Sequence, residues 1–464
     1  MHLTQLSLEN FRCFDHLTVE LNESLTVLIA PNGQGKTAIL DAARIALWPF
    51  VSAFDVVSGT MSDSGISIDD VLIRPTQQTA PINMEPRLPS LISARAVING
   101  QEINWSRSRQ KVSRGSKTTV KDAAPLARIA AACQSKIRIR DEADTETSHP
   151  GLDLPVIAYY GTGRLWKRRK LTLQRKTSSN VFSRTYAYLG CLDSASDYRS
   201  FTDWFFFNYA ADFEQKNEAL EGQGFSGLFD SETPYGDLLS AVSGSVDHVM
   251  ANSGWTGLRY SPSNQTLVMS HRELGKLKID QMSDGQRNMI AMVADIAYRC
   301  VRLNPHLTAR APLETKGVVL IDEVDMHLHP QWQQICLTSL RTAFPEIQFI
   351  VTTHSPQVLT SIRKEHIRTL GTAQNGSFVA SVPLAASYGE NSADVLQSIM
   401  HVDPQPPISE KSDLRRLVEL VDQGHYEIAE ARALIERLRR QLRPDHPQLQ
   451  RVDRSIRRQK ALKK

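Results

Sequence analysis

A glycine-rich loop between an apolar strand and a helix is the feature that most constrains the fold of this chain. The loop, Ala30-Pro-Asn-Gly-Gln-Gly-Lys-Thr37, fits the pattern Gly-x-x-x-x-Gly-Lys-[Ser/Thr] except that alanine replaces the first glycine. Residues 25–29 before it read as a short strand, and residues 38–47 after it are strong helix formers. Strand, loop and helix occur in the order that the motif requires, so the sequence predicts a site for the phosphates of a nucleotide.

Each part of this loop has an expected task at a nucleotide. Backbone N–H groups of residues 32–37 and the start of the following helix would surround the phosphates. Lys36 would reach the β- and γ-phosphates, and Thr37 would ligate Mg²⁺. Ala30 costs little if its backbone φ is negative. The predicted nucleotide-binding residues of the loop are Ala30, Pro31, Asn32, Gly33, Gln34, Gly35, Lys36 and Thr37.

Two adjacent carboxylates far along the chain are the expected partners of this loop. Asp322 closes the apolar run Gly317-Val-Val-Leu-Ile-Asp322, and Glu323 follows it. We expect Asp322 to ligate Mg²⁺ together with Thr37. In an extended chain Glu323 points away from Asp322, so it would polarise the attacking water as the catalytic base. A salt-bridged carboxylate pair at the end of a sheet is the structural alternative, which the glycine-rich loop disfavours.

Two weaker motifs complete the predicted site. Met282-Ser-Asp-Gly-Gln286 lies at the start of a predicted helix, where a serine hydroxyl and free amides bind phosphate well. His354 follows a predicted strand and would contact the γ-phosphate or the attacking water. Each motif alone also has an ordinary structural explanation. The candidate residues are Ser283, Asp284, Gly285 and Gln286 for binding and His354 for catalysis.

The order of the predicted elements indicates an α/β fold with a parallel sheet, split by a long insertion. Pro49 predicts the end of the first helix, and Asn99-Gly100 predicts a hairpin turn. The later motifs lie among alternating elements, namely a helix over 286–302, a strand over 318–321, a helix over 330–343 and a strand over 348–352. We therefore expect an N-terminal half of the domain over 1–50, a mixed α/β insertion over 51–275 (with a buried strand at 155–160), a C-terminal half over 276–403 and a basic helical tail over 408–464.

The tail is predicted to be a helical hairpin with one apolar stripe, followed by a short basic helix. Either its own domain or a partner protein must cover that stripe. Residues 431–464 hold 12 Lys/Arg and 3 Asp/Glu, and residues 161–190 hold 8 Lys/Arg and no acids. Such segments are either solvated surfaces or contacts for nucleic acid or an acidic partner.

Composition favours a protein of the cytoplasm. The chain has 464 residues, of which 41% are hydrophobic, and a formal net charge of +4. It lacks an apolar run long enough to span a membrane, and its N-terminus lacks the pattern of a secretory signal. The five cysteines are scattered, which is typical of free thiols in a reducing compartment.

The four motifs together resemble those of ABC-type ATPase heads, a superfamily that includes the SMC and RecF proteins. The resemblance covers the first ~50 residues and ~100 later ones, in the order that the motif contexts require. It implies ATP and Mg²⁺ as ligands and two heads that sandwich two nucleotides, so that residues 283–286 would serve the partner's nucleotide. Asp284 stands where glycine is usual. The family's glutamine loop is not identifiable, and His327 and His329 have the spacing of a metal pair or are structural.

Within that superfamily the chain resembles PtuA, the ATPase of Septu and of some retron anti-phage systems. The similar segments are Ile157–Trp166, the stretch His327-Leu-His-Pro330, and the tail around Arg443–Pro447. The resemblance implies an HNH nuclease partner resembling PtuB and a nucleic-acid target. The departures at Ala30 and Asp284 predict a slow, switch-like ATPase, and because no nuclease motif is visible, we expect no nuclease activity of its own. The alternatives are an ATPase resembling AriA that holds a Toprim effector, and a RecF-like DNA repair ATPase.

Overall fold

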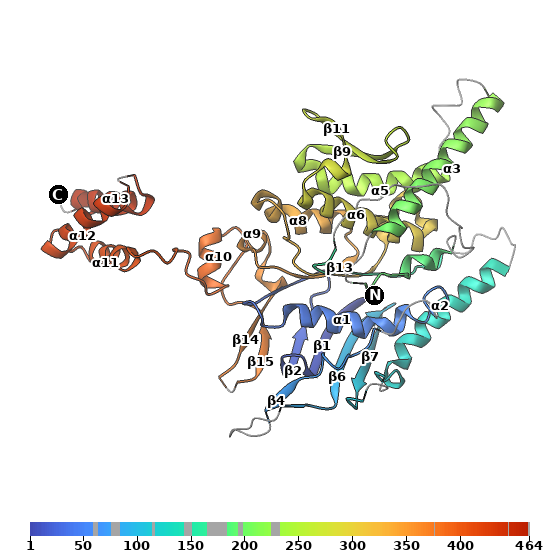
Figure 1. Ribbon diagram of the computed structural model, residues 1–464, viewed down its shortest axis with the longest axis horizontal. Coiled ribbons are helices and arrows are strands. Elements are labelled where there is room, and N and C mark those ends of the chain that lie inside the picture. Colours follow the sequence, from blue (N-terminus) through green and yellow to red (C-terminus); the bar gives the residue numbers. More distant parts are fainter. Residues whose placement is uncertain are drawn as a thin grey trace. The chain divides into compact units, whose positions relative to one another are not determined.

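The computed structural model describes residues 1–58, 64–75, 84–113, 117–142, 151–164, 183–193, 198–223, 233–374, 376–443 and 445–462. These form two compact units, residues 1–395 and residues 396–464 (Figure 1). Residues 51–275, predicted as an insertion between the two halves of the domain, lie in the same compact unit as both halves. The second unit begins before the predicted tail start at residue 408.

A six-stranded sheet with the order β15-β14-β3-β13-β12-β8 forms the centre of the first unit. Its strands pair in parallel except β15, which is antiparallel to β14. Every residue of the four strands β3, β8, β12 and β13 is buried, because helices cover both faces of the sheet: α1 lies on one side of β13, and α6 and α8 lie on the other (Figure 1). The strands are β3 (Leu25–Ile29), β8 (Val156–Tyr160), β12 (Gly317–Ile321), β13 (Ile347–Thr352), β14 (Ile367–Thr372) and β15 (Phe378–Ser381).

The strand β8 joins residues 51–275 to the central sheet. It was predicted as a buried strand, but it pairs with β12 at the edge of the central sheet. Gly317 permits this pairing, since a Cβ there would lie 2.0 Å from the carbonyl oxygen of Val156. The close backbone approach has no signature in residues 155–160 themselves.

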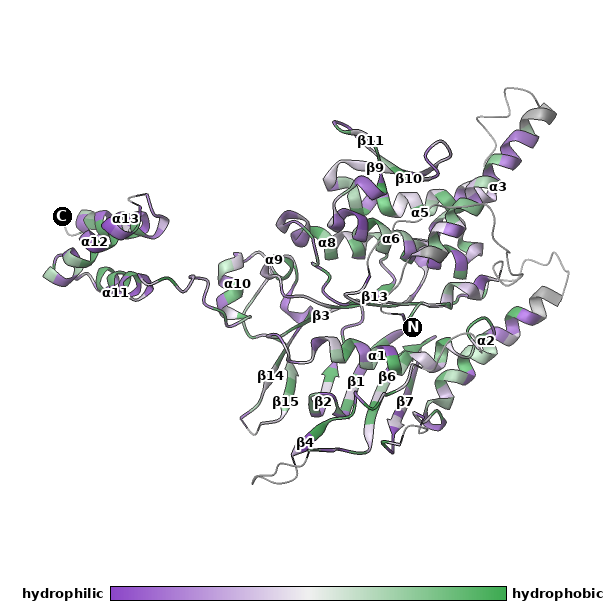
Figure 2. Ribbon diagram, viewed as in Figure 1, coloured by the Kyte–Doolittle hydropathy of each residue, from purple (hydrophilic) through white to green (hydrophobic). Residues whose placement is uncertain are grey.

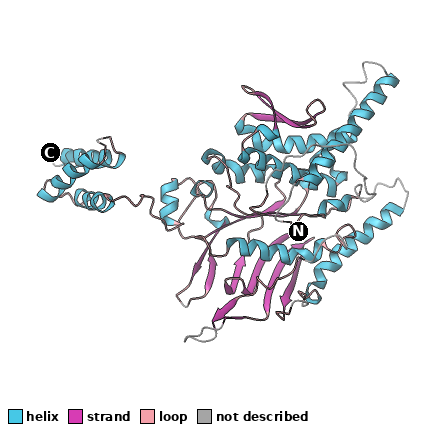
Figure 3. Ribbon diagram, in the orientation of Figure 1, coloured by secondary structure: helices cyan, strands magenta, loops and turns pink. Residues whose placement is uncertain are grey.

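A second, four-stranded antiparallel sheet packs beside α1, with the order β2-β1-β6-β7 (Figure 3). Asn99 and Gly100 form the turn between β6 and β7 with φ of 52° and 79°, as a two-residue hairpin turn requires, which confirms the predicted hairpin. The strands are β1 (His2–Phe11), β2 (Phe14–Glu20), β6 (Ser90–Ile98) and β7 (Gln101–Arg109), and a separate short pair is formed by β4 (Ile73–Pro75) and β5 (Met84–Pro86).

The helix α1 (Lys36–Val51) continues past Pro49, so the predicted end at Pro49 is wrong. Proline has no N–H for the carbonyl of Ile45 four residues earlier. The Arg107 guanidinium donates to that carbonyl instead, at 3.0 Å, and Trp105 Nε1 donates to Ala46 O at 2.8 Å. Because β7 supplies these donors, the last turn of the helix keeps its carbonyls satisfied.

The remaining helices and a third sheet complete the first unit. The aromatic run after Ser200 lies in α3, where Phe201 and Trp204 contact the ring of Tyr298 in α6, so these side chains belong to the core. The elements are α2 (Ala124–Glu142), α3 (Arg199–Gln223), α5 (Pro234–Met250), β9 (Trp255–Ser261), β10 (Thr266–His271), β11 (Gly275–Lys278), α6 (Asp284–Leu303), α7 (Ala311–Glu314), α8 (Pro330–Ala343), α9 (Pro356–Leu359) and α10 (Ser392–Ser398), which crosses the boundary between the units.

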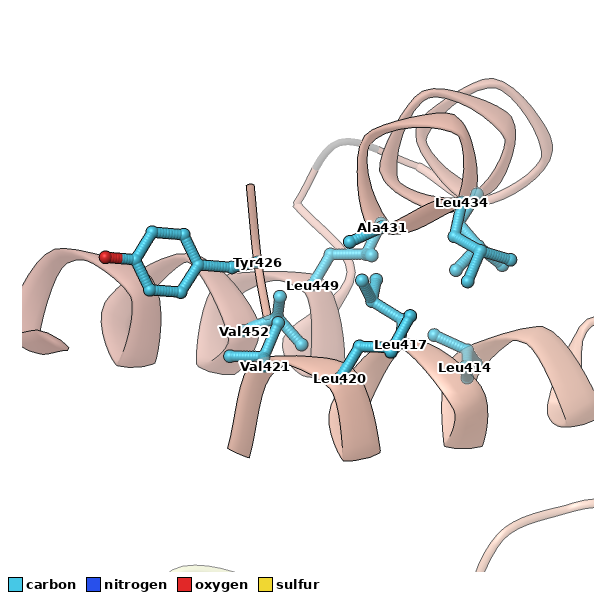
Figure 4. Packing of buried hydrophobic residues seen from close by; sticks show 10 residues of the cluster. Leu414, Leu417, Leu420, Val421, Tyr426, Ala431, Leu434, Leu449 and Val452 are labelled. Atoms are coloured by element: carbon cyan, nitrogen blue, oxygen red, sulfur yellow. The ribbon is translucent and has the colours of Figure 1, made fainter. Parts of the chain in front are cut away.

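The second unit is a bundle of α11 (Lys411–Asp422), α12 (Ala429–Gln441) and α13 (Pro447–Leu462). Leu417 and Leu420 of α11 pack with Leu434 of α12 and Leu449 of α13 (Figure 4). The third helix, longer than the short one predicted, therefore covers the apolar stripe within the unit. Most residues of α13 are hydrophilic (Figure 2). Among the described helices of either unit, none is long and apolar enough to cross a membrane.

Candidate functional site

The glycine-rich loop and the ends of β12 and β13 surround one cavity of about 510 Å³. This volume is in the range of small-ligand sites, and its position at the carboxyl ends of parallel strands is where α/β sheets bind ligands. The cavity contains predicted residues from both ends of the chain. Its lining comprises Arg12, Cys13, Asn32, Gly33, Gly35, Lys36, Thr37, Ala38, Asp322, Glu323 and His354.

The loop has the conformation that a phosphate cradle needs. Gly33 and Gly35 have φ of 79° and 82°, in the left-handed region that favours glycine. A Cβ on Gly35 would lie 2.3 Å from the ring of Phe14, so only glycine fits there. Ala30 has no positive φ, and the substitution of the usual glycine therefore adds no backbone strain.

Lys36 is buried at the first position of α1 with its ammonium group held by the loop. Its Nζ donates to the carbonyl oxygens of Ala30 at 2.8 Å and Pro31 at 3.3 Å. Burial lowers the pKa of Lys36, and the nearby carboxylates of Asp322 and Glu323 oppose that shift. Phosphate oxygens would be stronger acceptors for this cation than the two carbonyls.

Thr37 and Asp322 meet as the sequence predicts. Thr37 Oγ1 donates to Asp322 Oδ2 at 2.9 Å, and Thr352 Oγ1 donates to the other carboxylate oxygen at 2.6 Å. Asp322 is only 2% exposed. A hydroxyl and a carboxylate at a phosphate loop are the oxygen ligands that Mg²⁺ takes from proteins when substrate phosphates supply others, so this pair fits the predicted metal.

Glu323 lines the same cavity as Asp322 because the chain turns sharply between them. Its φ is 47°, so the extended backbone assumed for it is wrong. Both sides of this strained residue are held: its N–H donates to Thr352 Oγ1 at 2.7 Å, and its carbonyl accepts from Arg164 Nη2 at 2.7 Å. The turn, rather than strand alternation, directs Glu323 to the cavity.

Arg164 is a site residue that the sequence did not reveal. Its guanidinium is 3% exposed and donates to the carbonyls of Asp322 and Glu323, and to Gly161 O at 2.9 Å. Burial lowers the pKa of Arg164. The arginine thus ties the loop after β8 to the turn that carries both carboxylates. The only signal for it was its place in the segment Ile157–Trp166, of which Trp166 lies outside the described residues.

Arg12 is a second residue that was missed. It lies between β1 and β2, lines the cavity, and forms ion pairs of 2.8 Å with Asp41 and with Asp70. Two carboxylates therefore fix a cation beside the loop. Nothing in the pattern of residues 1–30 distinguished this arginine from other exposed cations.

His354 lines the cavity, whereas residues 283–286 do not. Ser283 is the N-cap of α6: its Oγ accepts from the N–H of Gln286 at 3.4 Å, and its own N–H donates to Gln286 Oε1 at 3.2 Å. Ser283 and Asp284 are exposed. Gly285 lies against the loop after β12, because a Cβ there would lie 2.2 Å from the carbonyl oxygen of His327.

The two histidines after β12 have separate positions. His329 caps α8, with its ring Nδ1 accepting from the N–H of Gln331 at 3.4 Å, and His327 has a left-handed φ of 62°. Across the parts of the chain that the structure describes, no group of three or more His, Cys, Asp or Glu side chains is arranged to hold a metal ion. The cap gives His329 a structural role without a metal.

Two family models match the chain, and each matched segment contains part of the candidate site. Residues 5–222 match the AAA domain, and residues 257–360 match the model described as "AAA domain, putative AbiEii toxin, Type IV TA system". Both models describe AAA domains, and the two matched segments together contain every residue that lines the cavity, so the chain is similar to AAA-type ATPases on both sides of the site. Family members use nucleotide and typically Mg²⁺, in agreement with the residues of the cavity.

Two curated proteins that are similar to this chain are named for retron and Septu systems. The "Retron Vc95 probable ATPase" of Vibrio cholerae is 25% identical over 471 residues, covering 91% of this chain and 84% of the relative. The "Septu protein PtuA" of Bacillus mycoides is 33% identical over 138 residues, covering 29% of this chain and 19% of the relative. Among solved structures, the SMC head domain from Thermotoga maritima is 15% identical, with a TM-score of 0.40, covering 83% of this chain and 100% of that one.

Proposed function

We propose that the chain is the ATP-hydrolysing sensor subunit of an anti-phage defence complex and that it controls an associated nuclease of the HNH type. The observation that carries the ATPase part is the 2.9 Å hydrogen bond from Thr37 to Asp322. It joins the phosphate loop to the carboxylate at the end of β12, inside a cavity that also contains Lys36, Glu323 and His354.

The residues of the cavity divide the proposed reaction among them. Lys36 and the N–H groups of the loop hold the phosphates of ATP. Thr37 and Asp322 would hold Mg²⁺, which would supply positive charge beside those phosphates. Glu323 orients the attacking water and takes its proton. His354 lies on the cavity wall, where it contacts the water or the terminal phosphate.

We further propose that two heads assemble around two nucleotides. Ser283 and Asp284 are exposed at the start of α6, and none of residues 283–286 lines its own chain's cavity. In this arrangement Ser283 and the free N–H groups beside it contact the nucleotide held by the partner's Lys36. Support comes from the helix N-terminus, which favours phosphate.

The defence role rests on the relatives. The retron ATPase aligns with most of this chain, and the Septu protein PtuA matches a shorter part. By analogy, ATP binding or turnover in this chain would switch a partner nuclease that degrades nucleic acid. The second unit is the proposed contact for that nuclease, since it folds around its own core and residues 431–464 carry 12 Lys/Arg against 3 Asp/Glu.

Two substitutions test the ATPase, and a deletion tests the partner. Lys36→Ala should abolish ATP binding, and Glu323→Gln should retain binding while turnover falls by roughly a hundredfold or more. Both variants should lose phage protection. If binding, turnover and protection all survive in both, the site is misassigned.

Removing residues 408–464 deletes the three-helix bundle α11–α13 whole, because its buried core lies within those residues. The truncated protein should keep ATP binding and lose co-purification with the adjacent nuclease. Undiminished co-purification would refute the second unit as the contact and leave the ATPase unaffected. A Toprim protein in place of an HNH protein in the purified complex would favour the alternative effector.

A further inference from the structure

A second cavity of about 460 Å³ lies on the small sheet β9–β10–β11, away from the ATP site. Figure 1 shows β9 and β11 at the outer edge of the first unit, beyond α5 and α6. The side chains that matter for the argument are Arg259, Lys276, Lys278, Tyr209, Tyr260 and Asn264, all of which line it. The lining contains three cations and no Asp or Glu.

The strand register places the three cations on one face of the sheet. Val268 of β10 pairs with both Arg259 of β9 and Lys278 of β11, so these cations lie in one row across the strands. Lys276 pairs with Ser270 one step along, and it lies on the same face as Lys278 because strand side chains alternate. The buried Leu258 and Tyr260 alternate with Arg259 and lie on the opposite face, which packs on α3 and α5.

The three cations also differ from three other exposed cations of this unit. Arg74, Arg95 and Arg138 each form an ion pair with a nearby carboxylate. Arg259, Lys276 and Lys278 form no ion pair with another described residue. Arg259 and Lys276 are exposed and Lys278 is half-buried. Three unpaired cations in one hollow attract a polyanion.

The rest of the lining indicates which polyanion. Tyr209 is half-buried, and its ring centroid lies 5.2 Å from that of Tyr260. Asn264 and the hydroxyl of Ser263 lie in the turn between β9 and β10. Cations for phosphates, an aromatic ring for a base and amide or hydroxyl groups for base edges are the components of single-strand binding sites. A double helix would contact only the rim of such a hollow.

We propose that this cavity, the β9–β11 cavity, binds the backbone of single-stranded nucleic acid. The inference rests on the proposed function, because it assigns a location to the nucleic-acid partner. Lys278 donates its N–H to Gln281 Oε1 at 3.0 Å, and Ser283 of the signature-like segment follows two residues after Gln281. Because Gln281 lines the cavity, a nucleic-acid strand bound there would lie two residues along the chain from Ser283, at the start of α6.

The test uses the full-length protein and a labelled single-stranded oligonucleotide of about 16 nucleotides, whose binding is followed by fluorescence anisotropy. The combined variant Arg259→Gln, Lys276→Gln and Lys278→Gln should bind at least about tenfold more weakly, and its slope of log affinity against log salt should fall by about 2, as three lost phosphate contacts predict. Tyr209→Leu should weaken binding without changing the slope.

The matched control removes the same charge elsewhere. Lys111→Gln, Lys117→Gln and Lys121→Gln together neutralise three exposed lysines of the same unit and should leave affinity and slope close to those of the unsubstituted protein. Equal losses in both triple variants, or no loss in the first, would overturn the proposal.

Further measurements identify the ligand and distinguish failure of this inference from failure of the proposed ATPase function. Inorganic phosphate or poly-glutamate that competes as well as the oligonucleotide, per charge, would overturn the assignment to nucleic acid. A double-stranded oligonucleotide that binds more tightly would overturn the single-strand preference. ATP binding is measured in the same samples: if the oligonucleotide fails to bind while ATP binds, only this inference fails, and if ATP does not bind, the proposed function fails.

Discussion

The two motifs that would contact nucleotide are built in opposite ways. The phosphate-loop side is held together by long-range contacts, as Thr37 reaches Asp322 and Arg164 reaches the carbonyl of Glu323. The signature-like side is satisfied locally, since Ser283 and Gln286 exchange two hydrogen bonds, the N–H of Arg287 donates to the carbonyl of Ser283, and Ser283 is exposed. One half of the site is therefore complete within the chain, whereas the other half faces outward.

The largest effect is expected from breaking the long-range half. Asp322→Ala removes the acceptor of two hydroxyl groups and the carboxylate that fits Mg²⁺, so turnover should fall by at least about a hundredfold and need more Mg²⁺. Magnesium titrations of turnover measure both. Glu346→Gln, an exposed carboxylate at the opposite end of β13, is the control and should behave as the unsubstituted protein. Normal turnover in Asp322→Ala would show that Asp322 is not needed to hold Mg²⁺.

The outward half should fail differently, because in the proposed assembly it would act on the partner's nucleotide. Ser283→Arg should leave ATP binding at its own Lys36 intact and lower turnover by roughly tenfold to a hundredfold through crowding of the second nucleotide. Mixed with Lys36→Ala, it should regain turnover above that of either variant alone, since one composite site then has both halves unaltered. Absence of recovery, together with lost ATP binding, would place Ser283 in its own chain's site.

A stability control separates this effect from the loss of a helix cap. Ser283→Ala and Thr233→Ala each remove an N-cap hydroxyl, the second at α5 far along the chain from any site motif. Each should cost about 1 kcal/mol of stability. Only the first should lower turnover.

Much of the candidate site could be predicted because its motif residues would act through their side chains, which the sequence specifies. Lys36, Thr37 and Asp322 are recognisable from residue type, spacing and the strand before them. Arg164 was not, because its partners are backbone carbonyls, which every residue has. The turn at Glu323 was missed for the same reason, as a φ of 47° at a glutamate is fixed by its surroundings.

The fold, too, depends on contacts between distant residues that local sequence patterns do not reveal. The strands around the loop followed from apolar runs, but the position of β8 beside β12 depends on a close approach at Gly317. The helix α1 passes Pro49 only because Arg107, distant in sequence, supplies the missing donor. Local patterns predict elements, whereas contacts between distant residues decide where they end and what they pair with.

Arg164 offers a finer test of the buried half. Arg164→Lys keeps the charge but cannot span the carbonyls of Asp322 and Glu323, so the turn should loosen. We expect kcat to fall by roughly tenfold and ATP affinity to change little, because Arg164 does not line the cavity. Arg184→Lys is the matched control, since Arg184 binds the carbonyls of Leu152 and Leu303 away from the site. Equal kinetic losses in both variants would show that Arg164 stabilises the fold in general and does not specifically position Glu323.

The smallest effect is expected at the loop's departure from its pattern. Ala30 has a negative φ, and Lys36 bonds to its carbonyl, which glycine would also supply. Ala30→Gly should therefore change kcat and KM by less than about threefold, and it should lower stability by roughly 0.5–1 kcal/mol, because glycine loses more backbone freedom on folding. Steady-state kinetics and thermal unfolding measure the two quantities. If Ala30→Gly instead raised turnover many-fold, the methyl group would be the cause of a slow ATPase. If it does not, any slowness must arise on the outward half of the site, where Asp284 replaces the usual glycine.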